Sequence, residues 1–159
     1  MLHGYRHEVA PISPHCPHPA CVTTAHDVAM DDYRDHVLGR AGERAAERWL
    51  IRRGWRILAT RWRGGGGEID IAAERRGILA TCEVKTRTQY DPHFPPISTG
   101  QRDRLARAAL AYVARHPEFA GHAIRPDLIV VVPRGAGWDI TRTEDITPER
   151  YSRSEGSSP

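Results

Sequence analysis

The sequence of 159 residues predicts one α/β domain, in which a central mixed five-stranded sheet is flanked by helices in the order α-β-β-β-α-β-β. Two segments carry apolar residues at spacings of three and four, as amphipathic helices do. Other segments alternate apolar and polar residues, and one run is apolar almost throughout, as in a strand buried on both faces. With 40% hydrophobic residues, the chain can bury a core.

The first helix is predicted to begin at residue 37, because small and apolar side chains recur on one side of a helix from there. These residues are Leu38, Ala41, Gly42, Ala45, Ala46 and Trp49. Gly54 ends the helix. Residues 55–62 (WRILATRW) alternate and are rich in large side chains, which predicts a strand. The four glycines at 64–67 predict a flexible turn.

Two more strands are predicted at residues 68–74 (EIDIAAE) and 78–85 (ILATCEVK). The Arg-Arg-Gly sequence between them indicates a hairpin. Residues 88–98 contain three prolines and predict a loop. A second amphipathic helix is predicted over residues 99–116, where Pro117 closes it.

The end of the domain follows from two more segments. The apolar run DLIVVVP at 127–133 predicts a buried strand, and GWDIT at 137–141 predicts an edge strand. The predicted domain covers residues 37–148. Residues 1–36 hold four of the twelve prolines and six of the nine histidines, which predicts a disordered His/Pro-rich extension. Residues 149–159 predict a disordered polar tail.

Basic charge is concentrated in the middle of the chain, where residues 37–116 carry 16 basic and 8 acidic side chains. Nearly all of the basic side chains are arginines, whose planar fork matches phosphate oxygens, so nucleic acid is the expected partner. The alternative is a solvated basic face. No apolar run predicts a membrane span and no secretory signal is recognised, and three cysteines do not suit a disulfide framework. We therefore expect a cytoplasmic protein.

The register of the predicted hairpin follows from strand alternation. Ile69 and Ile71 are expected on one face of their strand, with Asp70 on the other. Pairing Ala73 with Ile78 buries the apolar sets of both strands on one side of the sheet. A shift of the strand pairing by one residue would expose one of these apolar sets to water, so we expect a register that keeps both sets on the same side of the sheet.

In that register Asp70 lies across from Thr81 and diagonal to Glu83, so Asp70, Glu83 and Lys85 share one face. Two carboxylates that lie this close repel each other unless Lys85, a metal ion or both supply a cation. Lys85 is the only lysine of the chain. A surface salt bridge would be served equally well by arginine, whereas a compact ammonium can orient or give up a proton. The lysine therefore favours a chemical role over a salt bridge.

Asp, a hairpin and then Glu-x-Lys is the pattern of the PD-(D/E)xK nuclease superfamily. The stretch that begins GRAGE, continues through GEID and ends EVKTR closely resembles the YraN family of predicted endonucleases, related to archaeal Holliday-junction resolvases. The resemblance runs from about residue 37 to about residue 146. It implies a restriction-endonuclease-like fold with Asp70, Glu83 and Lys85 as the core motif.

The resemblance also implies a metal-dependent endonuclease that hydrolyses phosphodiester bonds in DNA, including branched or otherwise structured DNA. Asp70, Glu83 and the Val84 carbonyl would hold Mg²⁺ or Mn²⁺, and Lys85 would orient or deprotonate the attacking water. Glu43 in GRAGE matches the helix glutamate that completes such sites. The residues expected to contact nucleic acid are Arg87, Gln101 and Arg102. A homodimer is a further expectation, because symmetric cleavage of two strands needs two sites.

Two other interpretations stay open at this point. The first is a nucleic-acid-binding module that keeps the same fold without cleavage. The second is a zinc-bearing interaction protein. Its candidate ligands are His15, Cys16, His18 and Cys21. Trp55 and Trp62 are expected in the core or at a sheet edge, with base stacking as the alternative.

Overall fold

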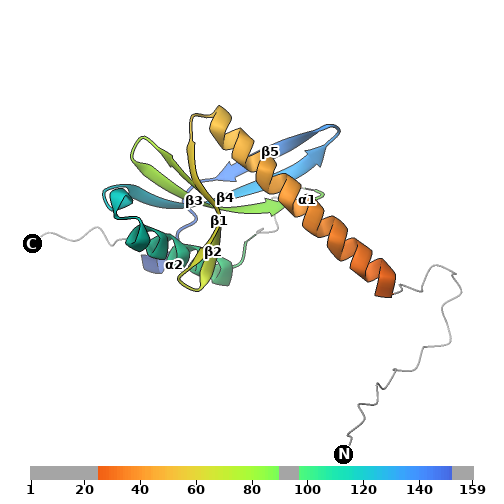
Figure 1. Ribbon diagram of the computed structural model, residues 1–159, viewed down its shortest axis with the longest axis horizontal. Coiled ribbons are helices and arrows are strands. Elements are labelled where there is room, and N and C mark those ends of the chain that lie inside the picture. Colours follow the sequence, from red (N-terminus) through yellow and green to blue (C-terminus); the bar gives the residue numbers. More distant parts are fainter. Residues whose placement is uncertain (1–24, 90–96, 152–159) are drawn as a thin grey trace, which may run out of the picture. The chain divides into compact units, whose positions relative to one another are not determined.

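The five strands form one sheet, in the order in which they occur along the chain (Figure 1). The computed structural model describes residues 25–89 and 97–151. Its elements are α1 (Ala25–Arg52), β1 (Arg56–Gly64), β2 (Gly67–Arg75), β3 (Ile78–Thr86), α2 (Thr99–Arg115), η1 (Pro117–Phe119), β4 (Ala123–Arg134), β5 (Gly137–Thr143) and η2 (Glu149–Tyr151). Strands β3 and β4 are parallel, and all other neighbours are antiparallel. The predicted α/β class and element order are confirmed.

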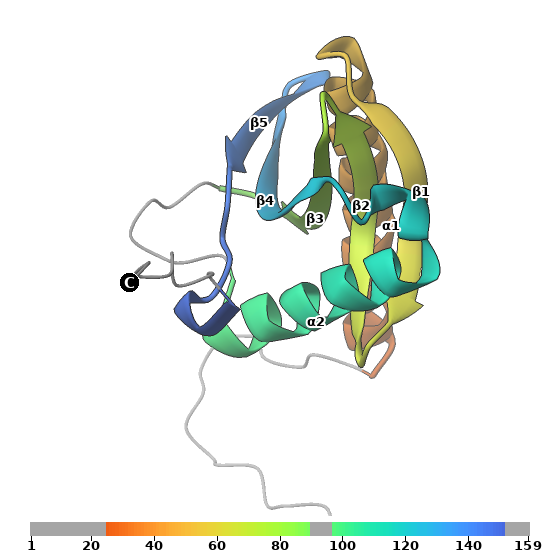
Figure 2. The same ribbon diagram turned by 90° about the vertical axis from the view of Figure 1, so that its left-hand side faces the viewer.

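Each face of the sheet carries a buried core under one helix, and Figure 2 shows α2 lying across the strands. On one face, Ala46 and Leu50 of α1 belong to a core with Ile71 of β2. On the other face, Leu105 and Tyr112 of α2 belong to the second core. Because both faces are covered, most side chains in the middle of the sheet are apolar, with Thr81 and Asp127 as buried polar exceptions.

Helix α1 begins at Ala25 and not at residue 37 as predicted. The last proline before it is Pro19, and no glycine interrupts the chain until Gly39, so nothing bars a helix over this stretch. The end of the chain also departs from the prediction of a tail from 149, because Glu149–Tyr151 form a 3-10 turn. Neither helix in the described ranges is both long and apolar enough to cross a membrane.

The other parts of the predicted extension and tail, residues 1–24 and 152–159, lie outside the described residues. The four candidate zinc ligands lie there as well, so the zinc interpretation stays a prediction. Cys82, on β3, is a free and buried thiol. Burial raises its pKa to about 12, and the nearby Asp127 carboxylate adds to the rise, so this thiol stays protonated and unreactive.

The predicted partner of Ala73 is wrong. Ala73 of β2 pairs with Ala80 of β3, and Ile78 pairs with Arg75. The register is thus displaced by two residues from the predicted one, which keeps the parity that burial demands. The short Arg-Arg-Gly connection accounts for the difference, because the strands pair directly next to the turn.

Ile69 and Ile71 were expected on one face, and this expectation is also wrong. Ile69 packs in the core under α2, whereas Ile71 packs in the core under α1. The change of face occurs at Asp70, where β1 has an irregular residue opposite: Arg61 adopts a positive φ of 53°. A left-handed residue turns the strand, so simple alternation does not continue through it.

The glycine run forms a tightly packed turn rather than a flexible one. A Cβ atom on Gly67 would lie 2.3 Å from the carbonyl oxygen of Arg104 in α2, and one on Gly65 would lie 2.6 Å from that of Arg107. Gly65 also has a φ of 59°. The β1–β2 turn therefore needs glycine in order to approach the backbone of α2.

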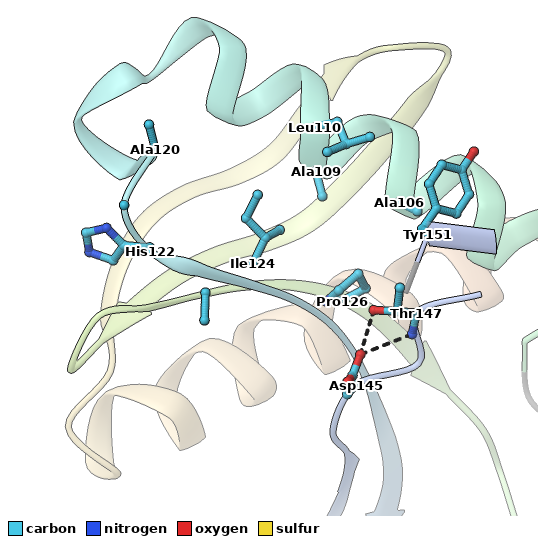
Figure 3. A pocket seen from close by; sticks show the side chains of 12 residues that line it. Ala106, Ala109, Leu110, Ala120, His122, Ile124, Pro126, Asp145, Thr147 and Tyr151 are labelled. Atoms are coloured by element: carbon cyan, nitrogen blue, oxygen red, sulfur yellow. Dashed lines mark hydrogen bonds between the residues drawn. The ribbon is translucent and has the colours of Figure 1, made fainter. Parts of the chain in front are cut away.

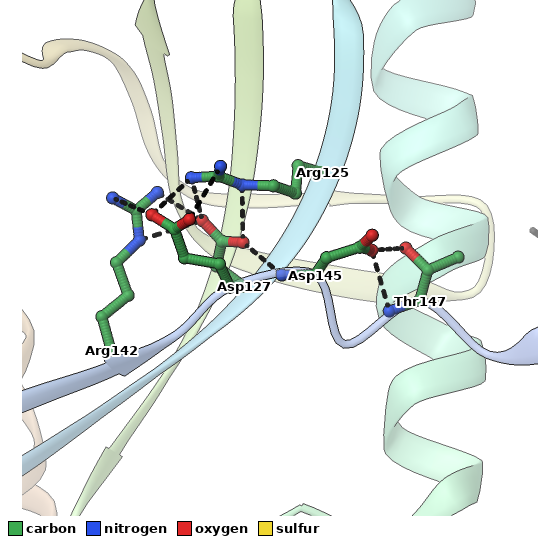
Figure 4. Close-up of polar contacts among 6 residues, drawn as sticks. Arg125, Asp127, Arg142, Asp145 and Thr147 are labelled. Atoms are coloured by element: carbon green, nitrogen blue, oxygen red, sulfur yellow. Dashed lines mark hydrogen bonds and ion pairs between the residues drawn. The ribbon is translucent and has the colours of Figure 1, made fainter.

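A buried carboxylate joins β4, β5 and the segment after β5 (Figure 4). Asp127 is fully buried and accepts hydrogen bonds from Arg125 Nε at 3.0 Å, Arg142 Nε at 3.0 Å and the Asp145 backbone N–H at 2.9 Å. Arg125 also bonds the Glu144 carboxylate. The buried charge is thereby paired and hydrogen-bonded, as a buried ion must be.

Both tryptophans singled out from the sequence pack in the interior. Trp55 is buried, and the guanidinium of Arg142 lies 4.4 Å from its ring centroid. Trp62 is partly buried and meets Tyr112 edge to face at a centroid distance of 5.2 Å. The core placement is confirmed for Trp55, and Trp62 packs against the second core.

Candidate functional site

Strands β2 and β3 part at Asp70. Their regular pairing ends at Ile71 and Cys82, so the next pair in this register would be Asp70 and Glu83. Instead, Oδ2 of Asp70 accepts a hydrogen bond of 2.7 Å from the backbone N–H of Val84. The side chain replaces a main-chain acceptor, which holds the carboxylate in the gap between the two strands.

Glu83 and Lys85 form an ion pair at the end of β3, with 2.5 Å between Lys85 Nζ and Glu83 Oε1. Their side chains are 18% and 19% exposed, so solvent screens this pair less than a surface pair. The two residues are separated by one position on a strand, so their side chains leave the same face. Glu83 thus neutralises the lysine.

Asp70 lies in an unfavourable electrostatic position. Burial raises the pKa of its carboxyl to about 6, and the nearby carboxylates of Glu83 and Glu43 add to the rise. The hydrogen bond from Val84 and the charge of Lys85 act in the opposite direction. All three predicted carboxylates and the lysine therefore lie close enough to influence one another. Their negative charge exceeds the positive charge of the one lysine.

Helix α1 reaches the end of β3 through a glycine. A Cβ atom on Gly42 would lie 2.0 Å from Oγ1 of Thr86, so only glycine allows the helix to come this close. Glu43 is the next residue, and it lines a depression together with Val84 and Lys85 of β3. The Gly-Glu pair in GRAGE therefore has a structural basis. Gly42 lets α1 approach β3, and the next residue, Glu43, then lies beside Val84 and Lys85.

Two recesses meet at Glu43. One is lined by Asp35, Leu38, Gly39, Glu43, Val84, Lys85, Thr86, Arg87 and Thr88. The other is lined by Arg40, Glu43, Arg44, Glu47, Thr60, Arg61, Asp70 and Ile71. Of the predicted site residues, Glu43, Asp70, Val84, Lys85 and Arg87 line these recesses, and Glu83 joins them through its ion pair with Lys85.

Gln101 and Arg102 line neither of the two recesses. Gln101 closes a capping box at the start of α2: its Oε1 accepts from the Ser98 backbone N–H at 3.0 Å, and its own N–H bonds Ser98 Oγ at 3.3 Å. The sequence Ser-x-x-Gln before a helical segment is the signal for this cap. The Nε atom of Arg102 is buried without a hydrogen-bond partner. Their predicted nucleic-acid contacts stay predictions.

The donor set at this site consists of oxygen atoms, which suits Mg²⁺ or Mn²⁺ better than a softer metal. Asp70, Glu83 and the carbonyl of Val84 would supply the oxygens under the assignment predicted from the sequence. Among residues 25–89 and 97–151, no three His, Cys, Asp or Glu side chains are already grouped as metal ligands. Glu83 faces Lys85, so binding would require its carboxylate to turn. Mg²⁺ commonly uses only one or two carboxylates together with water and substrate phosphate, so the residues present fit this ion.

A pocket of about 700 Å³ lies elsewhere, between α2, β4 with the segment before it, and the segment after β5 (Figure 3). Its lining is mainly alanine, leucine, isoleucine and proline. The Asp145 carboxylate in it accepts a hydrogen bond of 2.5 Å from the Thr147 hydroxyl. None of the predicted site residues lines this pocket, and size alone does not make it the place of the chemistry.

Three arginines beside the site were not predicted: Arg40, Arg44 and Arg61. Arg40 stands three residues before Glu43 and four before Arg44, so helical periodicity places Arg40 on the same side as each of them, although it does not show that this side meets the sheet. Arg61 carries no such signal, because a left-handed residue inside a strand is not visible in the sequence pattern.

Comparison with known proteins gives one consistent result. The model of Uncharacterised protein family UPF0102 matches residues 42–131. A UPF0102 protein of Rhodopseudomonas palustris (strain ATCC BAA-98 / CGA009) is 37% identical over 110 residues, which are 69% of this chain and 85% of that protein. A UPF0102 protein of Methylobacterium nodulans is 36% identical over 113 residues, 71% of this chain and 88% of that protein. One of Nitrobacter winogradskyi is 42% identical over 96 residues, 60% and 81% of the two chains.

Proposed function

The chain belongs to the UPF0102 family, the family of the YraN proteins, and from this membership and the geometry at Asp70 we propose that it is a metal-dependent endonuclease that hydrolyses phosphodiester bonds in DNA. The observation that carries the proposal is the carboxylate of Asp70, held between parting strands by the Val84 N–H. Glu83, Lys85 and Glu43 surround it. Partly buried carboxylates that outnumber the neighbouring cations favour the binding of a metal ion.

Asp70, Glu83 and the Val84 carbonyl would hold Mg²⁺ or Mn²⁺, with Glu43 beside them. When bound, such an ion supplies positive charge that stabilises the phosphate in the transition state and lowers the pKa of a bound water. The raised pKa of Asp70 supports this assignment, because a cation would relieve the repulsion that burial and the two glutamates create.

Lys85 would orient the attacking water and take part in its deprotonation. Its ammonium lies 2.5 Å from Glu83, so it is fixed next to the carboxylates and only 19% of it is exposed. Arg87, at the end of β3 and exposed, would contact the substrate backbone.

The test is cleavage of end-labelled branched, nicked and linear DNA in the presence of Mg²⁺ or Mn²⁺. The wild-type protein should cut at least one of these substrates, and Asp70→Asn should lose the activity. Asp139→Asn is the matched control, because Asp139 is an exposed carboxylate on β5 that pairs with Arg134 away from both recesses.

Binding of the same DNAs is measured in parallel, in EDTA. If wild-type protein binds DNA but cuts none of the substrates with either metal, the endonuclease proposal is wrong. The chain is then a nucleic-acid-binding module on the same fold.

A further inference from the structure

Arg40 and Arg44 of α1 and Arg61 of β1 line the recess that contains Asp70. We propose that these three arginines form a phosphate-binding subsite, which holds a phosphodiester group of the DNA strand next to the one that is cleaved. This inference rests on the proposed function, and it assigns the residues that bind the substrate strand beside the cleaved phosphodiester. The recess measures about 110 Å³, the space of three to four water molecules at about 30 Å³ each.

Arg61 is held at the site by its backbone. In the β1–β2 register, Thr60 pairs with Ile71 and Trp62 pairs with Ile69, so Arg61 lies opposite Asp70. Its φ of 53° is unfavourable for a residue with a Cβ atom, and no glycine replaces it here. Strained residues of this kind persist where the surrounding structure enforces them, and they concentrate at functional sites.

The charge of Arg61 is only weakly compensated. Among the residues that the structure describes, its one ion pair is with Glu68, and Arg61 Nε lies 3.8 Å from Glu68 Oε1. The same carboxylate is bound more closely by Arg63, through Nε at 3.1 Å and a terminal nitrogen at 3.0 Å. Arg63 thus already neutralises Glu68, which leaves the guanidinium of Arg61 available for another anion.

Arg40 and Arg44 are exposed and stand four residues apart, one turn of the helix. Like charges at this spacing destabilise a helix slightly. Glu43 and Glu47 lie between and beside them, yet within the described residues no ion pair joins Arg40 or Arg44 to either glutamate. An external anion would remove the repulsion between the two arginines.

A phosphodiester is the anion that this arrangement fits best. The guanidinium fork matches two phosphate oxygens, and phosphates in a DNA strand repeat, so one can be held beside the reacting one. The carboxylates of Glu43, Glu47 and Asp70 line the same recess and would repel a free carboxylate ligand as well as a phosphate. In the proposed enzyme, a cation bound to Asp70 would offset that repulsion for a DNA strand that contacts both the cation and the three arginines.

The experiment measures DNA affinity and its salt dependence for Arg40→Gln, Arg44→Gln and Arg61→Gln, each made in the Asp70→Asn protein, with a labelled branched DNA and a labelled duplex in EDTA. Asparagine at position 70 removes the charge of that recess carboxylate without a metal ion, and EDTA prevents metal-dependent cleavage during the titration. Each substitution should weaken binding by about tenfold and reduce the slope of log affinity against log salt by about one. The matched control is Arg48→Gln, one turn further along α1. Arg48 does not line the recess, so its substitution should change the affinity by at most about threefold.

Arg61→Gly separates binding from folding. Glycine tolerates the positive φ, so this variant should melt no lower than wild type while losing as much affinity as Arg61→Gln. If the affinity of the variants follows their melting temperatures, the arginines are structural and the proposal fails.

The two proposals can fail separately. A wild-type protein that cuts DNA, with subsite and control variants that bind equally well, overturns the subsite and leaves the nuclease intact. A protein that cuts no DNA, but loses affinity only through the three subsite arginines, overturns the nuclease and supports the subsite.

Discussion

At the scale of single residues, the most specific prediction concerns Lys85. Lys85→Arg keeps the charge but loses the compact ammonium next to Glu83, and a guanidinium stays protonated at any working pH. We expect single-turnover cleavage to fall by about 10²–10⁴-fold, the usual contribution of general acid–base catalysis, with little change in DNA affinity. An arginine variant that cuts at the wild-type rate would reduce Lys85 to a salt-bridge residue.

Asp70 makes the stability of the metal-free protein depend on pH. Its pKa is about 6 in the folded protein and about 3.9 in an unfolded chain, so the folded state binds the proton more tightly. The free energy of unfolding therefore falls as the pH rises from about 4 to above 6. Asp70→Asn removes this loss, so its stability relative to wild type should increase by about 2 kcal/mol between pH 4.5 and pH 7.5.

Urea unfolding of both proteins in EDTA at the two pH values measures this difference. Asp139→Asn, on the exposed edge strand, serves as the control for the substitution itself. A stability difference between Asp70→Asn and wild type that is the same at both pH values would show that burial does not raise the pKa of Asp70.

The residues of the site differ in how readily the sequence reveals them. Glu83 and Lys85 stand two apart on one strand, so alternation alone places them together. Asp70 was assigned to the right strand, but its partner was misplaced by two residues, since alternation fixes parity and not register. Glu43 was found only through the family resemblance, because nothing in helical periodicity shows where a helix crosses a sheet.

At the scale of elements, the contact between α1 and β3 decides whether Glu43 reaches the site. Gly42→Ala would place a Cβ atom 2.0 Å from Thr86 Oγ1. Overpacking of this kind costs about 1–3 kcal/mol, which exceeds the gain of about 1 kcal/mol from replacing glycine in a helix. We expect a net loss of stability and a loss of cleavage.

Two further variants test this explanation of Gly42→Ala in thermal unfolding. Gly39→Ala, on the same helix with no atom within 4 Å of the new Cβ, should gain stability by about 0.5–1 kcal/mol. Combining Gly42→Ala with Thr86→Ala removes the clashing oxygen and should restore most of the loss. If the double variant is no more stable than Gly42→Ala, the clash is not the cause.

The elements themselves were largely predictable, because their periodicity is strong and each is closed by a glycine, a proline or a turn. The start of α1 was not, since residues 25–36 lack an apolar face and only the absence of helix breakers allows them to continue the helix. The packing of Gly65 and Gly67 against α2 was also missed, because a glycine needed for close approach looks the same in the sequence as one in a flexible turn.

At the scale of the whole molecule, Asp127 of β4 holds β5 and the segment that follows it to the sheet. Asp127→Ala would leave Arg142, whose side chain is 7% exposed, without the carboxylate that neutralises it. Breaking a buried pair in this way costs about 3–5 kcal/mol. Asp139→Ala breaks an exposed pair with Arg134 and should cost at most about 1 kcal/mol. Equal losses in chemical denaturation would contradict the structural role assigned to Asp127.

The segment before α1 is the other question at this scale. Residues 1–24 have no periodic apolar face, and ordering a backbone costs about 1–2 kcal/mol per residue, so we expect them to add little to stability. Deleting residues 1–24 should leave the melting temperature of the chain nearly unchanged. A large drop that a chelator reproduces in the full-length protein would instead support a zinc site at the cysteines and histidines of that segment.

The three hairpin turns of the sheet differ in what surrounds them, and this has an evolutionary consequence. The turn at Gly65 and Gly67 abuts the backbone of α2, whereas a Cβ atom on Gly77 or Gly135 would meet no atom within 4 Å. Insertions and deletions accumulate where the chain has free space around it. Among relatives, the β2–β3 and β4–β5 turns should therefore vary in length, while the β1–β2 turn should keep its length and its glycines.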